Sequence, residues 1–354
     1  MQLISVVDLF CGVGGMTHGL VKEGFRVVAG IDADPTCKYA YEANNPGARF
    51  IERDLEEMSA DDILSLYPKE SLQILVGCAP CQPFSRYSQR YAKQSNKDEK
   101  WRLVRAFGRL VGKIKPTIVS MENVPELERH PVFAGFVAIL RKGGYHIWYD
   151  VVDCADYGVP QTRKRLVLLA SQLGPIQIIS KTHRKPRTVV AVIGSLPSIG
   201  AGQQSKNDPL HRASGVSGLN LRRLRHTPEG GTWRNWPKEL VLKCHKKETG
   251  HSYGSIYGRM WWEKPAPTIT TEFHAIGSGR FGHPEQDRAL SLREGAMLQT
   301  FPKGYEFVKY GDDWSIGTVA RHIGNAVPVR LARVIARSIE KHLREQPAQK
   351  RTDK

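Results

Sequence analysis

The sequence has few cysteines and no long apolar run. Six cysteines are scattered over 354 residues, which indicates reduced thiols in a cytosol rather than a disulfide framework. No stretch approaches the roughly 20 apolar residues that a membrane-spanning helix needs, and no charged segment precedes the mildly apolar first residues. We therefore expect neither a signal peptide nor a membrane span. The composition, with 40% hydrophobic and 8% aromatic residues, is that of a globular protein.

Acidic residues are also scarce relative to basic ones. The chain has 52 Lys or Arg against 35 Asp or Glu, a formal net charge of +17. Residues 181–250 concentrate this excess, with fourteen bases and four acids. A solvated basic face is one explanation, but Trp233 and Trp236 lie among the charges without the regular spacing of a helical stripe. We therefore expect a polyanion partner, and we favour nucleic acid.

Short β-rich runs alternate with helical segments over the first 170 residues. This alternation predicts an α/β fold, in which helices cover both faces of a mostly parallel sheet. In such sheets, ligands bind at the carboxyl ends of the strands. Five residues fall at or just after those ends and are expected to line one crevice: Phe10, Asp32, Asp54, Cys81 and Glu122. The expected strands are 4–10, 26–32, 49–54, 72–78, 117–121, 146–153 and 165–170, and the expected helices are 34–44, 59–67, 103–114 and 131–141.

The composition and periodicity of the chain change at about residue 181. Helical periodicity fades there, while Gly, Pro, His and Arg become frequent. We interpret residues 181–317 as a smaller, irregular or β-rich domain. Helical spacing of apolar residues returns at 318–345, and the polar tail 346–354 is expected to be disordered.

A glycine-rich loop, DLFCGVGGMTHGL, follows the first expected strand. The dinucleotide pattern would require Gly or Ala at position 17, where this chain has Thr17, and no phosphate-loop Lys is present. The loop therefore suits a cofactor without a pyrophosphate. Asp32 could bind both hydroxyls of a ribose, and Asp54 could accept from an adenine amino group. This combination favours S-adenosylmethionine. A generic glycine turn would explain the glycines but not the acids.

The stretch VGCAPCQPFS, residues 76–85, places Cys81 between Pro80 and the pair Gln82-Pro83. Three interpretations are open: a buried thiol, a redox or metal CxxC pair with Cys78, or a nucleophile held on a stiff turn. No second cysteine pair completes a zinc site, so we expect no metal and rank the pair well behind the nucleophile.

These stretches belong to a larger set of motifs that runs along nearly the whole chain. In this order and composition, they resemble the DNA (cytosine-5) methyltransferases, in particular the bacterial and phage restriction-modification type. No long N-terminal regulatory region precedes them, which speaks against the large eukaryotic maintenance enzymes. The motifs are DLFCGVGG at 8–15, GCAPCQPFS at 77–85, MENV at 121–124, QTRKR at 161–165, LREGAMLQTFP at 292–302 and GNAVP at 324–328.

The resemblance implies a Rossmann-like, S-adenosylmethionine-binding catalytic domain and a smaller target-recognition domain. The catalytic domain would comprise residues 1–180 and 318–345, with a last helix that returns to the first. The recognition domain would be 181–317, with the ninth family motif at 289–302.

The resemblance also implies the catalytic residues. Cys81 would add to cytosine C6, because a thiolate is a soft nucleophile that is accessible near neutral pH. Glu122 would protonate or hydrogen-bond N3, and Arg165 would contact O2 and Glu122. Arg163 would support the loop, and both arginines are expected on one face of a strand. No side chain identifies the base that removes the C5 proton.

For the cofactor, the resemblance implies contacts at ten positions. Two departures from the usual family pattern stand out: Asp32 replaces the usual Glu, and Met16 removes an aromatic contact. The implied positions are Phe10, Gly12, Gly14, Gly15, Asp32, Asp54, Pro80, Leu103, Asn325 and Val327.

The implied partner is double-stranded DNA, from which the target cytosine must be flipped before a thiol can reach C6. Residues 84–100 have the basic composition of a flap that closes on DNA. We expect a monomer in the bacterial cytosol, whose cognate restriction endonuclease acts on the same site without direct contact. A transfer-RNA methyltransferase, a silent DNA-binding relative and a nicotinamide oxidoreductase are the weaker alternatives. Four arginines are candidates for base reading: Arg222, Arg223, Arg225 and Arg234.

Overall fold

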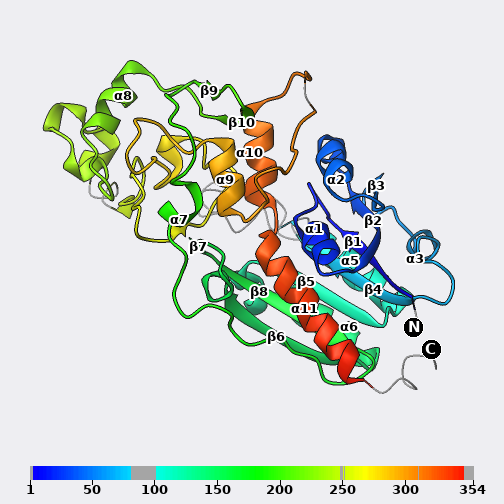
Figure 1. Ribbon diagram of the computed structural model, residues 1–354. Coiled ribbons are helices and arrows are strands. Elements are labelled where there is room, and N and C mark those ends of the chain that lie inside the picture. The colour runs from blue at the N-terminus through cyan, green and yellow to red at the C-terminus, as the bar shows by residue number, and fades with distance from the viewer. Residues whose placement is uncertain (1–2, 81–100, 248–249, 251, 310, 347–354) are drawn as a thin grey trace. The chain divides into compact units, whose positions relative to one another are not determined.

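The apolar runs of the N-terminal half form one seven-stranded sheet in the computed structural model. The structure describes residues 3–80, 101–247, 250, 252–309 and 311–346. The strand order is β3-β2-β1-β4-β5-β8-β6 (Figure 1). The strands are β1 (Ile4–Leu9), β2 (Arg26–Asp32), β3 (Arg49–Glu52), β4 (Leu72–Gly77), β5 (Ile118–Asn123), β6 (His146–Asp153) and β8 (Lys164–Ser171).

Six of these strands are parallel to one another and β8 alone runs in the opposite direction. β8 pairs antiparallel with both of its neighbours, β5 and β6. Its first residues therefore lie beside the carboxyl ends of those strands, where Asn123 pairs with Leu166 and Val152 pairs with Arg165. The predicted mostly parallel sheet is confirmed. Its single reversed strand brings the start of β8 to the edge where ligands bind.

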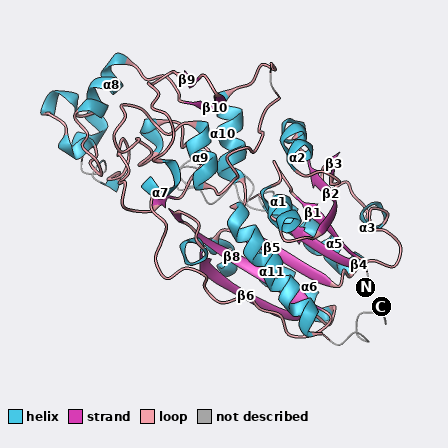
Figure 2. Cartoon of the chain, viewed as in Figure 1, coloured by secondary structure: helices cyan, strands magenta, loops and turns pink. Residues whose placement is uncertain are grey.

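Helices cover both faces of the sheet (Figure 2). On one face α1 packs against α11, and Tyr41 of α2 is hydrogen-bonded to Thr17 of α1. On the other face α5 packs against α3 and α6. The helices are α1 (Gly15–Lys22), α2 (Lys38–Asn44), α3 (Ala60–Leu64), α5 (Arg102–Ile114), α6 (Pro131–Lys142) and α11 (Val329–Glu345).

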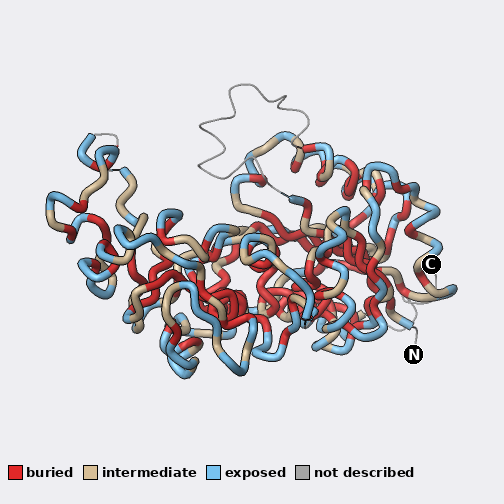
Figure 3. Tube along the Cα trace, turned by 90° about the horizontal axis from the view of Figure 1, so that it is seen from above, coloured by how far each residue is buried: buried red, intermediate tan, exposed pale blue. Residues whose placement is uncertain are grey.

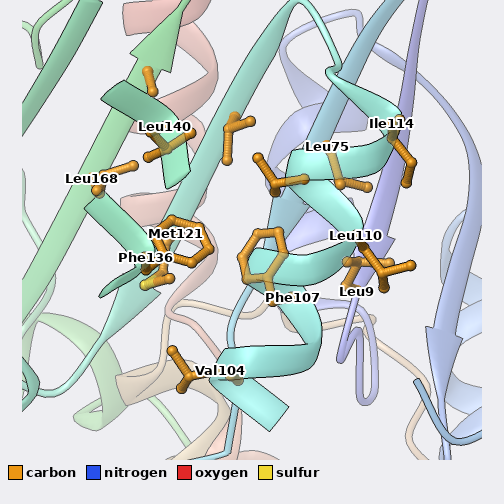
Figure 4. Close-up of a cluster of buried hydrophobic side chains, with 14 of the residues drawn as sticks. Leu9, Leu75, Val104, Phe107, Leu110, Ile114, Met121, Phe136, Leu140 and Leu168 are labelled. Atoms are coloured by element: carbon orange, nitrogen blue, oxygen red, sulfur yellow. The ribbon is translucent and has the colours of Figure 1, made fainter. Parts of the chain in front are cut away.

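The core under α5 shows why this segment is helical. Its buried apolar residues recur at spacings of three and four, which places them on one helix face. The ring of Phe107 is fully buried among Leu9, Leu75 and Met121 (Figure 4). Burying such a ring contributes roughly 1.5–3 kcal/mol relative to leaving it in water. Gly77 accommodates the ring, because a Cβ at that position would lie 2.8 Å from it.

The C-terminal helical region consists of two helices, α10 (Ile316–Asn325) and α11, separated at Pro328. The proline has no N–H to donate and so begins a new helix rather than continuing the old one. Glu23, at the end of α1, accepts hydrogen bonds from Arg333 and Arg337 of α11. The expected return of the last helix to the first is confirmed.

The chain divides into two compact units, each built from separate segments. The segment 154–163 and helix α10 belong to the second unit, whereas the sequence placed them in the catalytic domain. The reason lies in long-range pairing: β7 (Gln161–Thr162) pairs with β11 (Ala266–Pro267), and Gln161 donates to the carbonyl of Leu298. The first unit is Met1–Asp153, Lys164–Lys181 and Val327–Lys354, and the second is Cys154–Arg163 and Thr182–Ala326.

The second unit is irregular in its described part. Its strands have two to five residues, and buried and exposed segments alternate over short intervals along it (Figure 3). A buried ion pair between Arg288 and Glu294 and an aromatic cluster around Trp233 and Trp236 provide its local cores. Its further elements are α7 (Val190–Ile193), β9 (Gln204–Ser205), β10 (Asp208–Arg212), α8 (Gly218–Arg225), α9 (Leu292–Leu298), and the 3₁₀ helices η6 (Trp233–Asn235), η7 (Lys238–Leu240), η8 (Lys243–Lys246) and η10 (Ile276–Ser278).

Candidate active site

The glycine-rich loop connects β1 to α1 through left-handed backbone. Phe10, Gly12 and Gly14 have φ angles of 59°, 49° and 88°. Gly14 caps α1 in this conformation, which strains residues with a Cβ. A Cβ at Gly15 would lie 2.4 Å from the carbonyl oxygen of Val327. At Gly15, therefore, the backbone that approaches closely is that of Val327 in the same chain.

Asp32 ties the end of β2 to this loop. Its Oδ2 accepts from Gly12 N at 2.8 Å, and its Oδ1 accepts from Asp34 N at 2.9 Å. Burial raises the pKa of the Asp32 carboxyl, although the two backbone hydrogen bonds oppose that rise. Each oxygen keeps a lone pair, so the carboxylate could still accept from both hydroxyls of a ribose. The structure thus brings together the loop and the acid that the sequence singled out.

Asp54 and Leu103 lie beside this part of the sheet. Asp54 follows β3, accepts from Glu56 N at 2.9 Å and lies 4.0 Å from a guanidinium nitrogen of Arg102. Leu103 lies in the first turn of α5 and, like Phe10, packs half-buried against the core of the first unit. Phe10 is thus only partly buried by the core of the first unit.

Glu122 and Arg165 form a buried ion pair at the carboxyl edge of the sheet. Glu122 Oε1 lies 3.0 Å from Arg165 Nε, with the two side chains 8% and 13% exposed. The Nε–H of Arg165 does not point at Glu122 Oε1. Within the described ranges this oxygen accepts no hydrogen bond. An oxygen in this state can still accept from, or pass a proton to, an incoming group. The reversed direction of β8 makes the pair, because it sets the first residues of β8 beside the last residues of β5.

Asn123 fixes the loop that leads toward Cys81. Its Nδ2 donates to the carbonyl of Ala79 at 3.1 Å, which joins the end of β5 to the loop after β4. Cys78 lies in that loop, where removal from water and the charge of Glu122 raise the pKa of its thiol well above the ordinary range. Cys78 therefore stays a neutral thiol, which is a poor nucleophile. Pro80 is exposed, and Cys81 and the predicted flap at 84–100 lie outside the described residues.

The prediction that Arg163 shares a strand face with Arg165 is wrong. Arg163 falls between β7 and β8, where its own N–H donates to the carbonyl of Gln161 two residues earlier, a tight turn that interrupts the strand. Its buried guanidinium donates to the carbonyls of Ile269 at 3.0 Å and Ala326 at 3.5 Å. Arg163 therefore braces the backbone of the second unit. Asn325, the other predicted site residue of that unit, is exposed at the end of α10.

Sequence reasoning missed a buried polar network beneath the glycine loop. Thr17 Oγ1 donates to Asp8 Oδ2 at 2.7 Å and is 3.0 Å from the hydroxyl of Tyr41. Burial raises the pKa of Asp8 from 3.8 to about 7. The signal was present, because an acid in an apolar strand and a threonine in place of a third glycine are both unusual.

The aromatic residues of the basic region are not exposed stacking platforms. Trp233 and Trp236 are each 6% exposed and pack with Leu240. The ring of Trp233 stacks on His245 at a centroid distance of 4.5 Å. These tryptophans therefore form a local core, and they do not themselves offer a surface to the expected nucleic acid.

A mostly parallel sheet with one reversed strand, a glycine loop after β1 and an acid at the end of β2 define the Rossmann-like class of methyltransferases. The sequence profile of the C-5 cytosine-specific DNA methylase family matches residues 4–341. This chain belongs to that family, and its activity is DNA cytosine-5 methylation.

Individual relatives agree with this assignment. The Type II methylase M.HgiDII of Herpetosiphon aurantiacus is 55% identical over 344 residues, which cover 96% of each chain. The Type II methyltransferase M1.HphI of Haemophilus parahaemolyticus is 29% identical and covers 96% of this chain and 87% of its own. A prophage-encoded protein of E. coli, described as a DNA modification methyltransferase, shares the fold with a TM-score of 0.69 at 23% identity, over 97% of this chain and 100% of its own. No helix of the described chain has the length and apolarity to cross a membrane.

Proposed function

We propose that this chain transfers a methyl group to C5 of a flipped cytosine, with Cys81 as the nucleophile and S-adenosylmethionine as the donor. The observation that carries the proposal is the buried pair of Glu122 and Arg165, 3.0 Å apart. The pair lies at the edge where the loop after β4, braced by Asn123, leads toward Cys81. It supplies a carboxyl and a cation together, as stabilising a pyrimidine ring under attack requires.

The residues around the glycine loop fit S-adenosylmethionine. The loop offers positive-φ backbone and its own sequence carries no phosphate-loop Lys, and Asp32 offers two oxygens to ribose hydroxyls. Phe10 would cover the adenine ring and Asp54 would accept from its amino group. When bound, S-adenosylmethionine supplies an electrophilic methyl group for cytosine C5. The remaining proposed contacts are Gly12, Gly14, Gly15, Pro80, Leu103, Asn325 and Val327.

The proposed chemistry divides between three side chains. The thiolate of Cys81 forms a bond to C6, which moves electron density through the ring toward N3 and O2. Glu122 would give a proton or a hydrogen bond to N3, and Arg165 would hold the charge at O2. C5 thereby becomes a nucleophile. After transfer, a base removes the C5 proton, the double bond re-forms and the sulfur leaves C6.

Arg163 would support this chemistry without contacting the base. Its hydrogen bonds to the carbonyls of Ile269 and Ala326 hold backbone of the second unit in place. The proposed role of Arg163 is therefore to support the loop, while Arg165 would contact the base.

The proposed substrate form is duplex DNA with the target cytosine swung out of the helix, at a cost of a few kcal/mol. We assign target recognition to the second unit, where residues 182–250 carry thirteen bases and four acids. The names of the relatives support a role in a Type II restriction-modification system, with a cognate endonuclease acting on the same site. We further propose a monomer that works in the bacterial cytoplasm, where its DNA lies.

One experiment tests this proposal and also identifies the target. The protein is incubated with duplex DNA and labelled S-adenosylmethionine, and methylcytosine is mapped by bisulfite sequencing. Methylation at one short sequence is expected, with none on transfer RNA. Cys81→Ser should bind the same DNA and transfer nothing. Normal turnover by this variant would show that Cys81 is not the nucleophile. Methyl transfer to RNA alone would show that the substrate is RNA and not DNA.

A further inference from the structure

The structure separates the four candidate arginines of the second unit by their surroundings. Arg223 is 7% exposed, donates to the carbonyl of Leu240 at 3.0 Å and lies over the ring of Trp236. Arg225 is exposed but lies 3.4 Å from Asp287, and Arg234 lies over the ring of Trp233. Arg222 is exposed, and its side chain pairs with nothing in the described parts of the chain. Arg222 is therefore the candidate whose guanidinium has all its donors available.

Helix α8 presents Arg222 on a sharply divided face. At 100° per residue, the exposed positions fall within one arc of the helix, and the buried and half-buried positions fall on the opposite side. The exposed arc carries no acid. It also carries Leu219, which at 47% exposure is one of the few large apolar side chains that the described chain leaves in water. The exposed residues are Gly218, Leu219, Arg222, Arg225 and His226.

The inner face of α8 is held rigidly. Arg223 anchors the helix through the carbonyl of Leu240, as described above, and Arg259 donates to the carbonyls of Leu224 and Thr227 at its C-terminal end. Arg259 also forms an ion pair with Asp287, and Arg225 pairs with the same carboxylate. Ser217 caps the N-terminal end by accepting from Asn220 N. A helix fixed at both ends presents its outer side chains in one defined orientation.

We propose that the exposed face of α8 enters the major groove of the DNA substrate, that Arg222 reads a guanine there, and that Leu219 contacts base edges beside it. The inference rests on the proposed role of the second unit in target recognition. An α-helix with its side chains is roughly 10–12 Å in diameter, which suits a major groove about 12 Å wide.

Charge and shape favour DNA over a protein partner for this face. Arg222 and Arg225 are exposed on this face, and although Asp287 pairs with Arg225, no residue of the exposed arc is acidic, which complements a phosphate-lined groove. An arginine with all its donors available can form the bidentate pair with guanine O6 and N7. An exposed leucine one turn away matches the apolar methyl group of thymine.

The test is a specificity profile of Arg222→Ala. The target is first mapped with the wild type, and kcat/KM is then measured on the mapped duplex and on duplexes with each recognised base pair replaced in turn. Arg222→Ala should lose roughly 5- to 150-fold of discrimination at one G·C position, the range of a bidentate arginine–guanine pair. The other positions and the KM for S-adenosylmethionine should change less than about twofold. Arg222→Lys, which keeps the charge without the planar fork, should lose discrimination at the same position.

Arg184→Ala is the matched control, because Arg184 is an exposed arginine of the second unit whose side chain likewise has no partner within the described chain. It should keep every discrimination ratio. Unchanged ratios for Arg222→Ala, or a uniform loss at all positions, would overturn the inference while leaving the proposed function intact. A wild type that methylates no DNA would instead overturn the proposed function.

A photo-crosslinker at position 219 gives an independent readout of the partner. Benzoylphenylalanine in place of Leu219 should crosslink to the mapped duplex and not to a second protein chain. Crosslinking to protein alone, or no crosslink to a duplex that is methylated normally, would overturn the placement of α8 in the groove.

Discussion

Asp8 makes the stability of the first unit depend on pH in a direction that is unusual for a carboxyl group. The side chain is fully buried beneath the glycine loop, and burial raises its pKa from 3.8 to about 7. Between these values the folded protein keeps a proton that the unfolded chain has released. Stability therefore falls as pH rises from about 4 to 7, and the full penalty applies above 7.

The size of this effect follows from the shift. A difference of roughly three pKa units at about 1.4 kcal/mol each gives about 4 kcal/mol as an upper value. Asp8→Asn copies the shape of the neutral acid, keeps an oxygen for the hydroxyl of Thr17 and does not titrate. The variant should match the wild type near pH 4 and exceed it by up to about 4 kcal/mol at pH 8. In a unit of this size, that corresponds to roughly 10 °C in melting temperature.

Thermal unfolding of the two proteins at steps from pH 4.5 to 8.5 measures the difference directly, because other titrating groups affect both equally. Thr17→Val is the companion variant: it removes the hydroxyl that lowers the pKa of Asp8, so its stability should continue to fall at higher pH than that of the wild type. A wild type and an Asp8→Asn variant whose melting temperatures differ by a constant amount across the range would refute the reasoning.

Three further predictions concern the site and its supports. Glu122→Gln should lower single-turnover methyl transfer by roughly 10²–10⁴-fold with DNA binding kept, and a near-normal rate would remove Glu122 from the chemistry. Gly15→Ala should destabilise the protein by roughly 1–3 kcal/mol, because its Cβ would meet the carbonyl of Val327 at 2.4 Å. The matched change Gly135→Ala in α6, where a Cβ meets nothing within 4 Å, should stabilise by roughly 0.5–1 kcal/mol in the same melting assay. Arg288→Met should cost roughly 3–5 kcal/mol in denaturant unfolding, because Glu294 would keep a buried charge without its cation; a loss below about 1 kcal/mol would show that the pair contributes little.

The sequence predicted the sheet, the helices between its strands and the residues at its carboxyl edge, because local apolar periodicity carries that information. Periodicity carries no information on strand direction, so the reversal of β8 could not be read from it. That reversal is what sets Arg165 beside Glu122. The placement of Arg163 was wrong for a related reason, since the strand is interrupted where β7 pairs with residues a hundred positions away.

The arginines of α8 show the same limit. The run LRRLR shows that this segment is basic, but it does not show which of the adjacent residues Arg222 and Arg223 points inward. The carbonyl of Leu240 and the ring of Trp236 decide that Arg223 is buried and Arg222 exposed. Leu240 ends the 3₁₀ helix η7 and Trp236 directly follows η6, and helical periodicity predicts neither segment. The burial of the tryptophans of this region depends on the same contacts and could not be predicted either.

The most direct measurement of the central claim is the covalent adduct itself. The protein is incubated with S-adenosylmethionine and a duplex that carries 5-fluorocytosine at the mapped target. Fluorine cannot leave C5 as a proton does, so the sulfur–C6 bond should persist. Mass spectrometry of the digested adduct should then place the modified base on the peptide that contains Cys81. A link through another residue, or methyl transfer to normal DNA with no adduct on the fluorinated duplex, would contradict the account.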